Sequence, residues 1–460
     1  MSNKQATLDL GTKPVGKLLL QYALPAIIAM TASSLYNMVD SVFIGQGVGA
    51  MAIAGLAVTF PFMNLSAAFG AAIGIGSSAL LSVKLGQKDY SIAQRILGNN
   101  VTLNIIVGIM LTVVGLLFLD PILMFFGASE NTLPYAREYM EVILLGNAVT
   151  HLYLGMNAML RAASKPRQAM YATIFTVLLN TALDPLFIYT FQMGIRGAAV
   201  ATILSQSVAL MWQFRLFSNR QELLHLKRGI YGLKSHIVKN IIAIGMSPFA
   251  MNVCACVVVI FINNGLLRHG GDMAIGAYGI VNRIAFVFVM ICMGLNQGMQ
   301  PIAGYNYGAQ HHDRLMRVLK LAIISATVIT TTGFLVAMLA PRLCVSLFTH
   351  DEELITISVK VMRIIMCMFP IVGYQMVITN FFQSIGKAKV SIFLSLSRQL
   401  IFLLPPLIVL PRFWGIDGIL WSMPLSDTMA AVVTAIVMTI YVRKVRTRRA
   451  ETGTNVLTRN

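Results

Sequence analysis

The stretch that decides the fold is LLLQYALPAIIAMTASSLYNMVDSVFIG at residues 18–45. A helix needs about 20 predominantly apolar residues to cross a bilayer, and this stretch exceeds that length while carrying a single charge, Asp40. The run is too long and too uniformly apolar for a barrel strand, so a helix is predicted, because a helix satisfies its own backbone hydrogen bonds in lipid. The polar residues before it do not resemble a cleaved leader, so we expect the span to be retained.

The composition extends this prediction to the whole chain of 460 residues, of which 57% are apolar and 11% charged. Soluble domains average about 45–50% apolar and about 25% charged residues, so a soluble enzyme is excluded. The sequence predicts an all-α polytopic membrane protein with 12 transmembrane helices. The predicted spans are 18–45, 50–80, 92–118, 135–160, 168–191, 195–217, 238–266, 273–302, 314–340, 354–383, 388–411 and 416–442.

The net charge of +18 follows the predicted topology. The two terminal segments and the even-numbered connections lie on one side of the membrane and together carry 26 Lys and Arg residues. The odd-numbered connections lie on the opposite side and carry five. Because cytoplasmic loops are enriched in Lys and Arg, we expect a multi-pass protein of the plasma (inner) membrane with both termini in the cytoplasm. The basic charge then needs no nucleic acid as partner, and contact with anionic membrane lipids is expected.

The sequence also repeats itself at an offset of about 222 residues. Met51-Ala52-Ile53 aligns with Met273-Ala274-Ile275, and at an offset of 221 the segment 194–197 aligns with 415–418. Each repeat holds six spans, so the two six-helix bundles form a 6+6 pseudo-symmetric repeat about an axis along the membrane normal. Two like-oriented bundles on a flexible linker suit a transporter that opens alternately to either side. The predicted parts are an N-terminal lobe at 1–217, a cytoplasmic linker at 218–238, a C-terminal lobe at 239–442 and a basic cytoplasmic tail at 443–460.

Ionisable residues at membrane depth are the main functional candidates, because a buried charge there is unfavourable without a partner. Asp40 has Tyr36 and Asn37 on its helix face, and Asp184 has Asn180 one turn before it. Burial favours a proton on such carboxyl groups, and carboxylate, amide and hydroxyl oxygens are also the ligands that hard cations prefer. The residues alone do not distinguish H⁺ from Na⁺ as a coupling ion.

In the second half, the intramembrane cations are Arg283 and Arg398, and the best-placed acid is Asp427. Arg283 either neutralises a neighbour or extends toward the membrane surface, and Arg398 is expected near a lipid headgroup. The sequence has no Ser/His/Asp set or paired-His helix that would indicate catalysis. We therefore expect neither an enzyme nor a bound cofactor.

Several motifs in order resemble the multidrug and toxic compound extrusion (MATE) family, in particular its prokaryotic branch with an acidic pair in the N-terminal lobe. The resemblance covers essentially the whole chain. The motifs that carry it are Leu24-Pro25 with Tyr36-Asn37-xx-Asp40-Ser41-xx-Ile44-Gly45, Gly155-Met156-Asn157 with Arg161-Ala162-Ala163-xx-Pro166, Leu179-Asn180-xxx-Asp184-Pro185, and Gly194-Ile195-xx-Gly197-Ala198-Ala199-xx-Thr202.

The resemblance implies roles for individual residues. It implies a proton or Na⁺ site, the latter being the only metal site expected, formed by Asp40, Asn180, Asp184 and Thr202. It also implies a hinge at Pro25, where the first span bends when Asp40 is protonated. The residues expected in the hydrogen-bond network and substrate cavity are Tyr36, Asn37, Tyr139, Asn157 and Arg283. Another branch of the family has acidic residues in the C-terminal lobe, where this chain has Asn263, Asn264, Asn282 and Arg283, so no cation site is expected there.

Together these features predict a monomeric secondary antiporter that exports small amphipathic, cationic organic compounds in exchange for H⁺ or Na⁺ by alternating access. The alternative is a flippase for lipid-linked saccharides, which a related branch performs with a similar architecture. A flippase needs a cluster of Arg or Lys for the pyrophosphate, and Arg283 is nearly alone in the spans. That scarcity of intramembrane cations favours the antiporter.

Overall fold

The computed structural model describes residues 3–457, and it is almost entirely helical. Short helices lie between the long ones, and two π-helical segments, η1 and η2, interrupt the longer elements. The elements are α1 Asn3–Thr12, α2 Val15–Gly47, α3 Ala50–Gly86, α4 Tyr90–Leu117, α5 Leu119–Phe125, α6 Leu133–Leu145, α7 Asn147–Ala162, α8 Pro166–Pro185, η1 Leu186–Thr190, α9 Gly194–Phe217, α10 Ser235–Gly308, α11 His312–Leu339, α12 Pro341–Ser346, α13 Glu352–Ile365, α14 Phe369–Ser384, α15 Ala388–Leu396, η2 Ser397–Leu403, α16 Leu404–Val409 and α17 Pro411–Leu457.

The predicted membrane spans are present as helices of sufficient length and apolarity. Within residues 3–457, ten helices can cross a membrane, and twelve can when each of two bent helix pairs counts as one span. The bent pairs are α6 with α7, which meet at 56°, and α13 with α14, which meet at 51°. The helix α10 contains two spans, because Gly271 has a non-helical conformation at its middle. The all-helical polytopic fold predicted from the sequence is confirmed.

The backbone shows the internal repeat independently of residue identity. Residues with positive φ recur 222 positions apart, as at Gly49 and Gly271, and one pair recurs 221 apart, Gly194 (φ 57°) and Gly415 (φ 55°). Positive φ strains most L residues, so its recurrence marks equivalent turns rather than chance. The fourth span of each repeat is also bent, after Leu145 and after Ile365. The two repeats therefore share turns and bends as well as helices.

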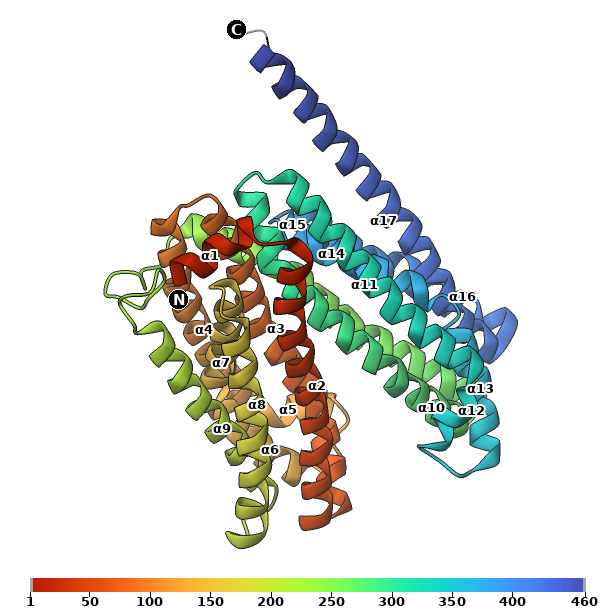
Figure 1. Cartoon of the computed structure of the whole chain (residues 1–460). Helices are drawn as coiled ribbons and strands as arrows, with labels where there is room; N and C mark the ends of the chain where they lie inside the picture. The colour runs from red at the N-terminus through yellow and green to blue at the C-terminus, as the bar shows by residue number, and fades with distance from the viewer. Residues whose placement is uncertain (1–2, 458–460) are drawn as a thin grey trace. The chain divides into compact units, whose positions relative to one another are not determined.

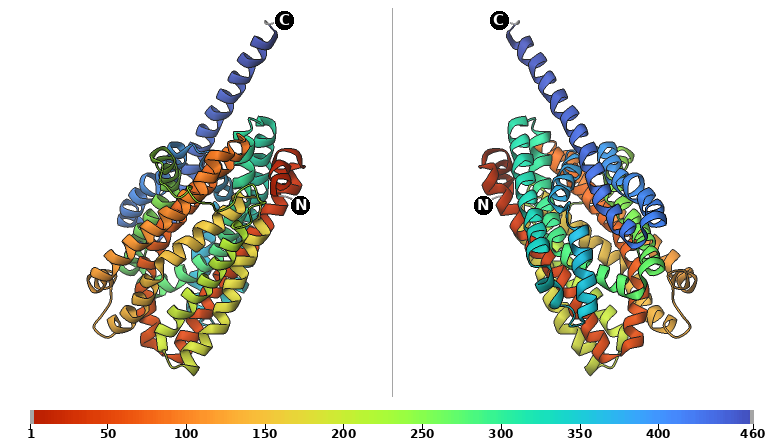
Figure 2. Two further views of the ribbon diagram at one scale, coloured as in Figure 1. Left: turned by 90° about the vertical axis from the view of Figure 1, so that its left-hand side faces the viewer. Right: turned by 90° about the vertical axis from the view of Figure 1, so that its right-hand side faces the viewer.

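The chain forms two compact units. Unit 1 contains residues 1–256, 289–322 and 380–392, and unit 2 contains 257–288, 323–379 and 393–460. In unit 1, α2 packs on α8, α8 on α9, and α7 on both α3 and α4. Figure 1 shows these helices running alongside one another, and the side views show α8 next to α9 (Figure 2). The packing of α2 and α9 against α8 brings the predicted ion-site residues into one bundle.

Glycines allow part of the second repeat to pack closely on the first inside unit 1. A Cβ at Gly86 of α3 would lie 2.0 Å from the Tyr305 carbonyl oxygen, and a Cβ at Gly308 of α10 would lie 2.0 Å from the Val83 carbonyl oxygen. A Cβ at Gly298 would lie 2.5 Å from the Ala23 Cα, close to Pro25 in sequence. Only glycine permits such backbone approach. The glycines of α10 thereby fix its contacts with α2 and α3.

The linker between the repeats, which was expected to be flexible, is held against α4. The Asn99 amide donates to the carbonyl oxygens of Ile230 (3.3 Å) and Gly232 (3.1 Å), and Thr102 Oγ1 donates to the Tyr231 carbonyl (2.9 Å). Ile230 is buried, and its carbonyl oxygen approaches Gly98 of α4. The expectation overlooked that a polar helix face can satisfy the linker's backbone groups.

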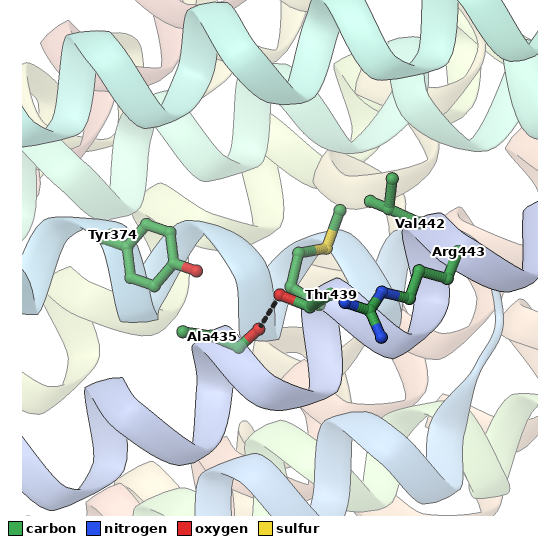
Figure 3. Close-up of a pocket in the computed structure, with 6 residues that line it drawn as sticks. Tyr374, Ala435, Thr439, Val442 and Arg443 are labelled. Carbon is green, nitrogen blue, oxygen red and sulfur yellow. Dashed lines mark hydrogen bonds between the residues drawn. The ribbon is translucent and has the colours of Figure 1, made fainter. Parts of the chain in front are cut away.

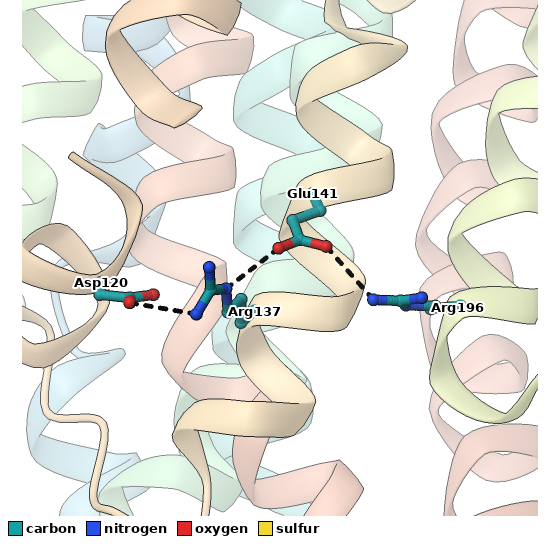
Figure 4. A network of polar contacts seen from close by, with 4 residues as sticks. All are labelled: Asp120, Arg137, Glu141 and Arg196. Carbon is teal, nitrogen blue, oxygen red and sulfur yellow. Dashed lines mark hydrogen bonds and ion pairs between the residues drawn. The ribbon is translucent and has the colours of Figure 1, made fainter. Parts of the chain in front are cut away.

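An exposed network of ion pairs connects α5, α6 and α9 (Figure 4). Arg137 contacts Asp120 (3.3 Å) and Glu141 (3.0 Å), and Arg196 contacts Glu141 (3.3 Å). All four side chains are at least 31% exposed. Exposed pairs contribute about 0–1 kcal/mol each, so this network orients the helix ends rather than determining the fold.

Candidate ion-coupling site

Two carboxyl groups meet between α2 and α8. Asp40 of α2 is 6% exposed and Asp184 of α8 is fully buried. The two carboxyl groups lie within hydrogen-bonding reach of each other. Two ionised carboxylates this close repel each other in a medium of low dielectric constant. The pair is therefore stable with a proton or a cation between the two groups, which is the property that a coupling site requires.

Asn180 and Thr202 complete the site beside Asp184. The Asn180 amide nitrogen donates to Asp184 Oδ2 (3.1 Å), while its amide oxygen accepts from the Thr202 backbone N–H (3.0 Å) and lies 3.2 Å from the Thr202 hydroxyl. Asn180 is 1% and Thr202 is 9% exposed. Residues four apart share a helix face, which explains why Asn180 meets Asp184 within α8. Three helices, α2, α8 and α9, thus supply the four predicted ion-site residues.

The local sequence explains the end of α8 at this point. Pro185 lacks a backbone N–H and cannot continue the regular hydrogen-bond ladder, and the π-helical segment η1 follows it directly. Gly197 of α9 lies against η1, where a Cβ would be 2.9 Å from the Phe187 carbonyl carbon. Interruptions of this kind are frequent at functional sites. They place Asp184 where the helix is least regular.

Two oxygen atoms of the site are buried and lack hydrogen-bond partners. They are Asp40 Oδ1 and Asp184 Oδ1, and neither has a partner among the residues that the structure describes. A buried polar atom without a partner costs about 1–3 kcal/mol, so these oxygens favour a ligand that supplies positive charge or a hydrogen-bond donor. Ile44 and Ile188, both buried in the neighbouring apolar cluster, restrict water. The arrangement suits a proton or a small alkali cation.

Comparison with known proteins identifies the family. A family model described as MatE matches residues 25–186 and 248–407, which are most of both repeats. The chain belongs to the MatE family. The resemblance to MATE efflux transporters that the sequence motifs predicted is thereby confirmed, and the MatE proteins are transporters rather than enzymes.

Relatives of the MatE chain cover nearly its whole length. The multidrug export protein MepA of Staphylococcus haemolyticus is 26% identical over 415 residues, which are 90% of this chain and 91% of that protein. A solved structure of the MATE multidrug transporter DinF-BH is 34% identical, with a TM-score of 0.86, over 93% of this chain and 96% of that one. A MATE crystal structure in the bent conformation, 22% identical, has a TM-score of 0.91 over 98% and 99% of the chains and supports the fold.

The other residues predicted for the MatE hydrogen-bond network divide into two groups. Asn157 and Tyr139 are buried at 7% and 2% exposure. The Asn157 amide donates to the Ala169 carbonyl (3.0 Å) and to Thr173 Oγ1 (3.2 Å), and its oxygen accepts from Arg161. Asn157 thus connects α7 to α8, while Tyr139 of α6 belongs to an apolar cluster that also contains Ile44.

Four other residues were predicted for the hydrogen-bond network, the substrate cavity or the hinge, and the structure does not establish a role for them. The side chains of Tyr36 and Asn37 lie outside the described residues. Pro25 lies inside α2, which continues as one helix from Val15 to Gly47. Arg283 is exposed on α10 and makes no hydrogen bond or ion pair with any residue in the described part of the chain. The roles of these four residues stay predictions.

The structure gives Arg398 a partner that the sequence did not predict. Its Nε and Nη2 atoms lie 2.9 Å and 2.8 Å from Asp427 Oδ1, and its expected position near a lipid headgroup stays a prediction. Arg398 belongs to η2 and Asp427 to α17, which pack together in unit 2. The expectation considered each charge alone, whereas oppositely charged residues at membrane depth pair with one another.

Sequence reasoning also missed a buried polar cluster between α3 and α7. Ser66 Oγ donates to Asn147 Oδ1 (2.8 Å) and lies 3.4 Å from the Nε2 atom of His151, which is fully buried. A Cβ at Gly70 would lie 2.9 Å from the His151 ring. A histidine within an apolar span was a detectable signal, because such residues are rare in membrane helices.

A small cavity in unit 2 contains none of the predicted site residues. Its volume is about 280 Å³, and it lies between α14 and α17 (Figure 3). Thr439 Oγ1 donates to the Ala435 carbonyl (2.8 Å) at its wall. The residues that line it are Tyr374, Ala435, Met438, Thr439, Val442 and Arg443. With no carboxylate among them, this cavity does not resemble the ion site of unit 1.

Proposed function

We propose that this MatE protein is a secondary antiporter that exports amphipathic, cationic organic compounds across the inner membrane in exchange for H⁺ or Na⁺. The observation that carries the proposal is the buried Asp40–Asp184 pair with its two unpartnered oxygens. The relatives named as multidrug export proteins support an organic substrate. Asp40, Asn180, Asp184 and Thr202 are the proposed ion ligands, with no other cofactor.

Coupling follows from the way an ion changes this pair. Without an ion, the two carboxylates repel and their oxygens lack partners, so conformations that separate α2 from α8 or admit water are favoured. With a proton or Na⁺ bound, the two carboxyl groups no longer repel, and α2 packs closely against α8. Exchange requires that ion and substrate favour opposite conformations, because a ligand shifts an equilibrium only through its differential affinity for the two states.

The proposed conformational change involves the helices that carry the site. Pro25 removes one hydrogen bond from α2, and Pro185 and η1 interrupt the helix after α8. Both prolines lie on the helices that provide the carboxylates. We propose that loading Asp40 and Asp184 rearranges α2, α8 and α9, shrinks the substrate cavity and releases the exported compound.

The proposed orientation places both termini and the linker in the cytoplasm, with the protein acting as a monomer. It rests on the distribution of Lys and Arg residues between the two sets of connections. Substituted-cysteine labelling tests it with a membrane-impermeant maleimide, using Ser218→Cys in the linker and Ser129→Cys in an opposite connection, in a background without the five native cysteines. Labelling of intact cells at position 129 alone is expected, and labelling at position 218 alone would reverse the orientation.

The function is tested by uptake of a fluorescent organic cation into everted vesicles, energised separately by a pH gradient and by a Na⁺ gradient. Uptake above that of vesicles without the protein is expected with at least one gradient, and its collapse on adding the matching ionophore identifies the ion. Uptake that requires ATP, or uptake that persists when both gradients are dissipated, would contradict antiport.

A further inference from the structure

The two repeats meet inside unit 1, because residues 289–322 of the second repeat belong to that unit. The Gln300 amide of α10 donates to Ser78 Oγ of α3 (2.9 Å), and both side chains are buried. The contact between the two helices continues to Gly86 and Gly308, where each helix ends. A transporter that opens at this end of the helices must therefore separate α3 from α10.

The helix α1 of the first repeat is bound at the same end to residues of the second repeat. The Asn306 amide of α10 donates to the Leu10 carbonyl oxygen (3.1 Å). The Arg314 guanidinium of α11 donates through Nη2 to the carbonyl oxygens of Leu10 (3.1 Å) and Lys13 (2.6 Å). Through Nη1 it donates to the Thr12 carbonyl oxygen (3.4 Å). The last carbonyl groups of a helix lack partners within it, and a positive charge is favourable there, so Arg314 and Asn306 cap α1 from outside its own repeat.

The two capping side chains are themselves fixed. Arg314 Nε donates to Asn306 Oδ1 (3.2 Å), and Asn306 is fully buried. The apolar side of α1 is docked as well, since Leu10 is 1% exposed and a Cβ at Gly11 would lie 3.0 Å from the Tyr305 ring. The side views show α1 beside the turn between α10 and α11 (Figure 2). Both polar and apolar contacts thus hold the end of α1 on the second repeat.

The end of α1 determines where α2 begins, and α2 carries Asp40. Only Lys13 and Pro14 separate the two helices, and the Pro14 carbonyl accepts from the Leu18 N–H (3.1 Å) in the first turn of α2. Arg314 binds the carbonyl group of Lys13, so it holds this short connection itself. The start of the helix that carries Asp40 is therefore positioned by a residue of α11.

We infer that α1 is a latch that stabilises the conformation closed at this end, and that Arg314 is the positioning residue that holds α1 and the start of α2 in that conformation. The donors of the capping hydrogen bonds belong to the second repeat and the acceptors to the first. Separation of the repeats breaks these bonds, so they make opening at this end less favourable. The inference rests on the proposed function, because antiport needs two conformations whose balance is set by such contacts.

The test measures how often the contact between α3 and α10 opens. The reporter is Ser82→Cys in a background without the five native cysteines. Ser82 is 1% exposed, and its Cβ would lie 2.7 Å from a Cβ at Gly304 of α10. Because a buried thiol reacts only when the structure around it opens, the rate of maleimide labelling of the purified full-length protein in detergent reports the open population.

Three variants and a second reporter separate the latch from a general loss of stability. Arg314→Gln removes the cap, and Arg314→Lys keeps the charge but not the planar set of donors. Arg317→Gln changes an exposed arginine of the same helix and is the matched control. The second reporter is Ser205→Cys in α9, which is fully buried and whose hydroxyl donates within its own helix.

Arg314→Gln is expected to raise the labelling rate at position 82 about tenfold, because hydrogen bonds to a charged group are among the stronger ones. Arg314→Lys is expected to raise it less, while Arg317→Gln leaves it unchanged and the rate at position 205 stays constant in all variants. An unchanged rate at position 82 in Arg314→Gln, an equal rise in Arg317→Gln, or an equal rise at position 205 would overturn the inference. Labelling needs neither gradient nor substrate, so its outcome is distinguished from a failure of gradient-driven uptake, which tests the proposed function.

Discussion

Both units contain buried acidic residues within their long helices, but the two units neutralise these residues in different ways. In unit 1, Asp40 and Asp184 face each other without a basic partner among the described residues, and within that part of the chain each leaves one oxygen unpaired. In unit 2, Asp427 is bound by Arg398 at 2.8 Å. A carboxylate that is paired with an arginine is already neutralised and gains little from binding a mobile ion. Two carboxylates that face each other repel unless they bind a proton or a cation. Unit 1 thus keeps two buried carboxyl groups together on α2 and α8, whereas unit 2 pairs its buried carboxylate on α17 with an arginine of η2, so the repeated fold carries different charge chemistry in its two units.

The largest expected effect is the loss of ion dependence in unit 1. In the wild type, the affinity for a transported dye is expected to change by about five- to 150-fold between ion-free and ion-loaded conditions, the usual range of coupling between two sites. Asp40→Asn and Asp184→Asn are each expected to abolish this change. Dye titrations at two pH values, with and without Na⁺, measure it.

The contrasting variant is Asp427→Asn, because Arg398 already neutralises that carboxylate. The ratio of dye affinities with and without the ion is expected to remain as in the wild type. If Asp427→Asn kept its thermal stability but bound the dye equally well with and without the ion, the two units would share the coupling role, and the distinction between them would fail.

Packing provides the second test. Gly86 of unit 1 has no space for a side chain, since a Cβ would lie 2.0 Å from the Tyr305 carbonyl oxygen, whereas Gly279 of unit 2 has no atom within 4 Å of such a Cβ. Overpacking costs about 1–3 kcal/mol or more, so Gly86→Val is expected to lower the Tm of the purified protein by several degrees. Gly279→Ala is the control and is expected to leave the Tm within error. Equal Tm values for both variants would show that the contact of α3 with α10 is not maintained.

A smaller effect is expected from the uncharged ligand Asn180 of the ion site. Asn180→Ala removes the donor to Asp184 Oδ2 and the acceptor of the Thr202 N–H. Loss of a hydrogen bond to a charged group costs about 1.5–3 kcal/mol, so the apparent affinity for the coupling ion is expected to fall about tenfold or more without loss of transport at saturating ion. An ion titration of vesicle uptake measures this. If maximal uptake fell while the apparent affinity did not change, Asn180 would act on the conformational change instead.

The smallest effect is expected at the exposed network of Figure 4. Arg196→Gln removes one contact to Glu141, at 3.3 Å and 51% exposure of the arginine. Exposed pairs contribute about 0–1 kcal/mol, so little change in Tm and none in dye transport is expected. A Tm loss comparable to that of Gly86→Val would show that these ion pairs hold the outer helix ends together.

The sequence was sufficient for the fold because its strongest signals are physical requirements of the bilayer. Apolar runs longer than a membrane is thick predict helices such as α4 and α9 without tertiary information. The bends within the fourth span of each repeat were not predicted, although Gly146 at the first bend and Pro370, three residues after Cys367 at the second, both disfavour a continuous helix. The docked linker was missed because its carbonyl groups meet Asn99 only in the folded chain.

The candidate ion site was predictable in its residues and unpredictable in its geometry. Asp40 and Asp184 stand out because acids are rare in apolar spans, and the spacing of Asn180 and Asp184 defines one helix face. The approach of α2 to α8 is a tertiary contact of residues far apart in sequence, so the unpaired oxygens became visible only in the structure. The pairing of Arg398 with Asp427, which are 29 residues apart, was not predicted for the same reason.

The proposed role of the Asp40–Asp184 pair is to couple an ion gradient to export. The most direct test is gradient-driven uptake of a fluorescent cation into everted vesicles that contain equal amounts of the wild type, Asp40→Asn or Asp184→Asn. Uptake by the wild type and none above background by either variant is expected, while both variants still bind the dye when purified. Gradient-driven uptake by both variants at the wild-type rate would show that the Asp40–Asp184 pair does not couple the ion to export.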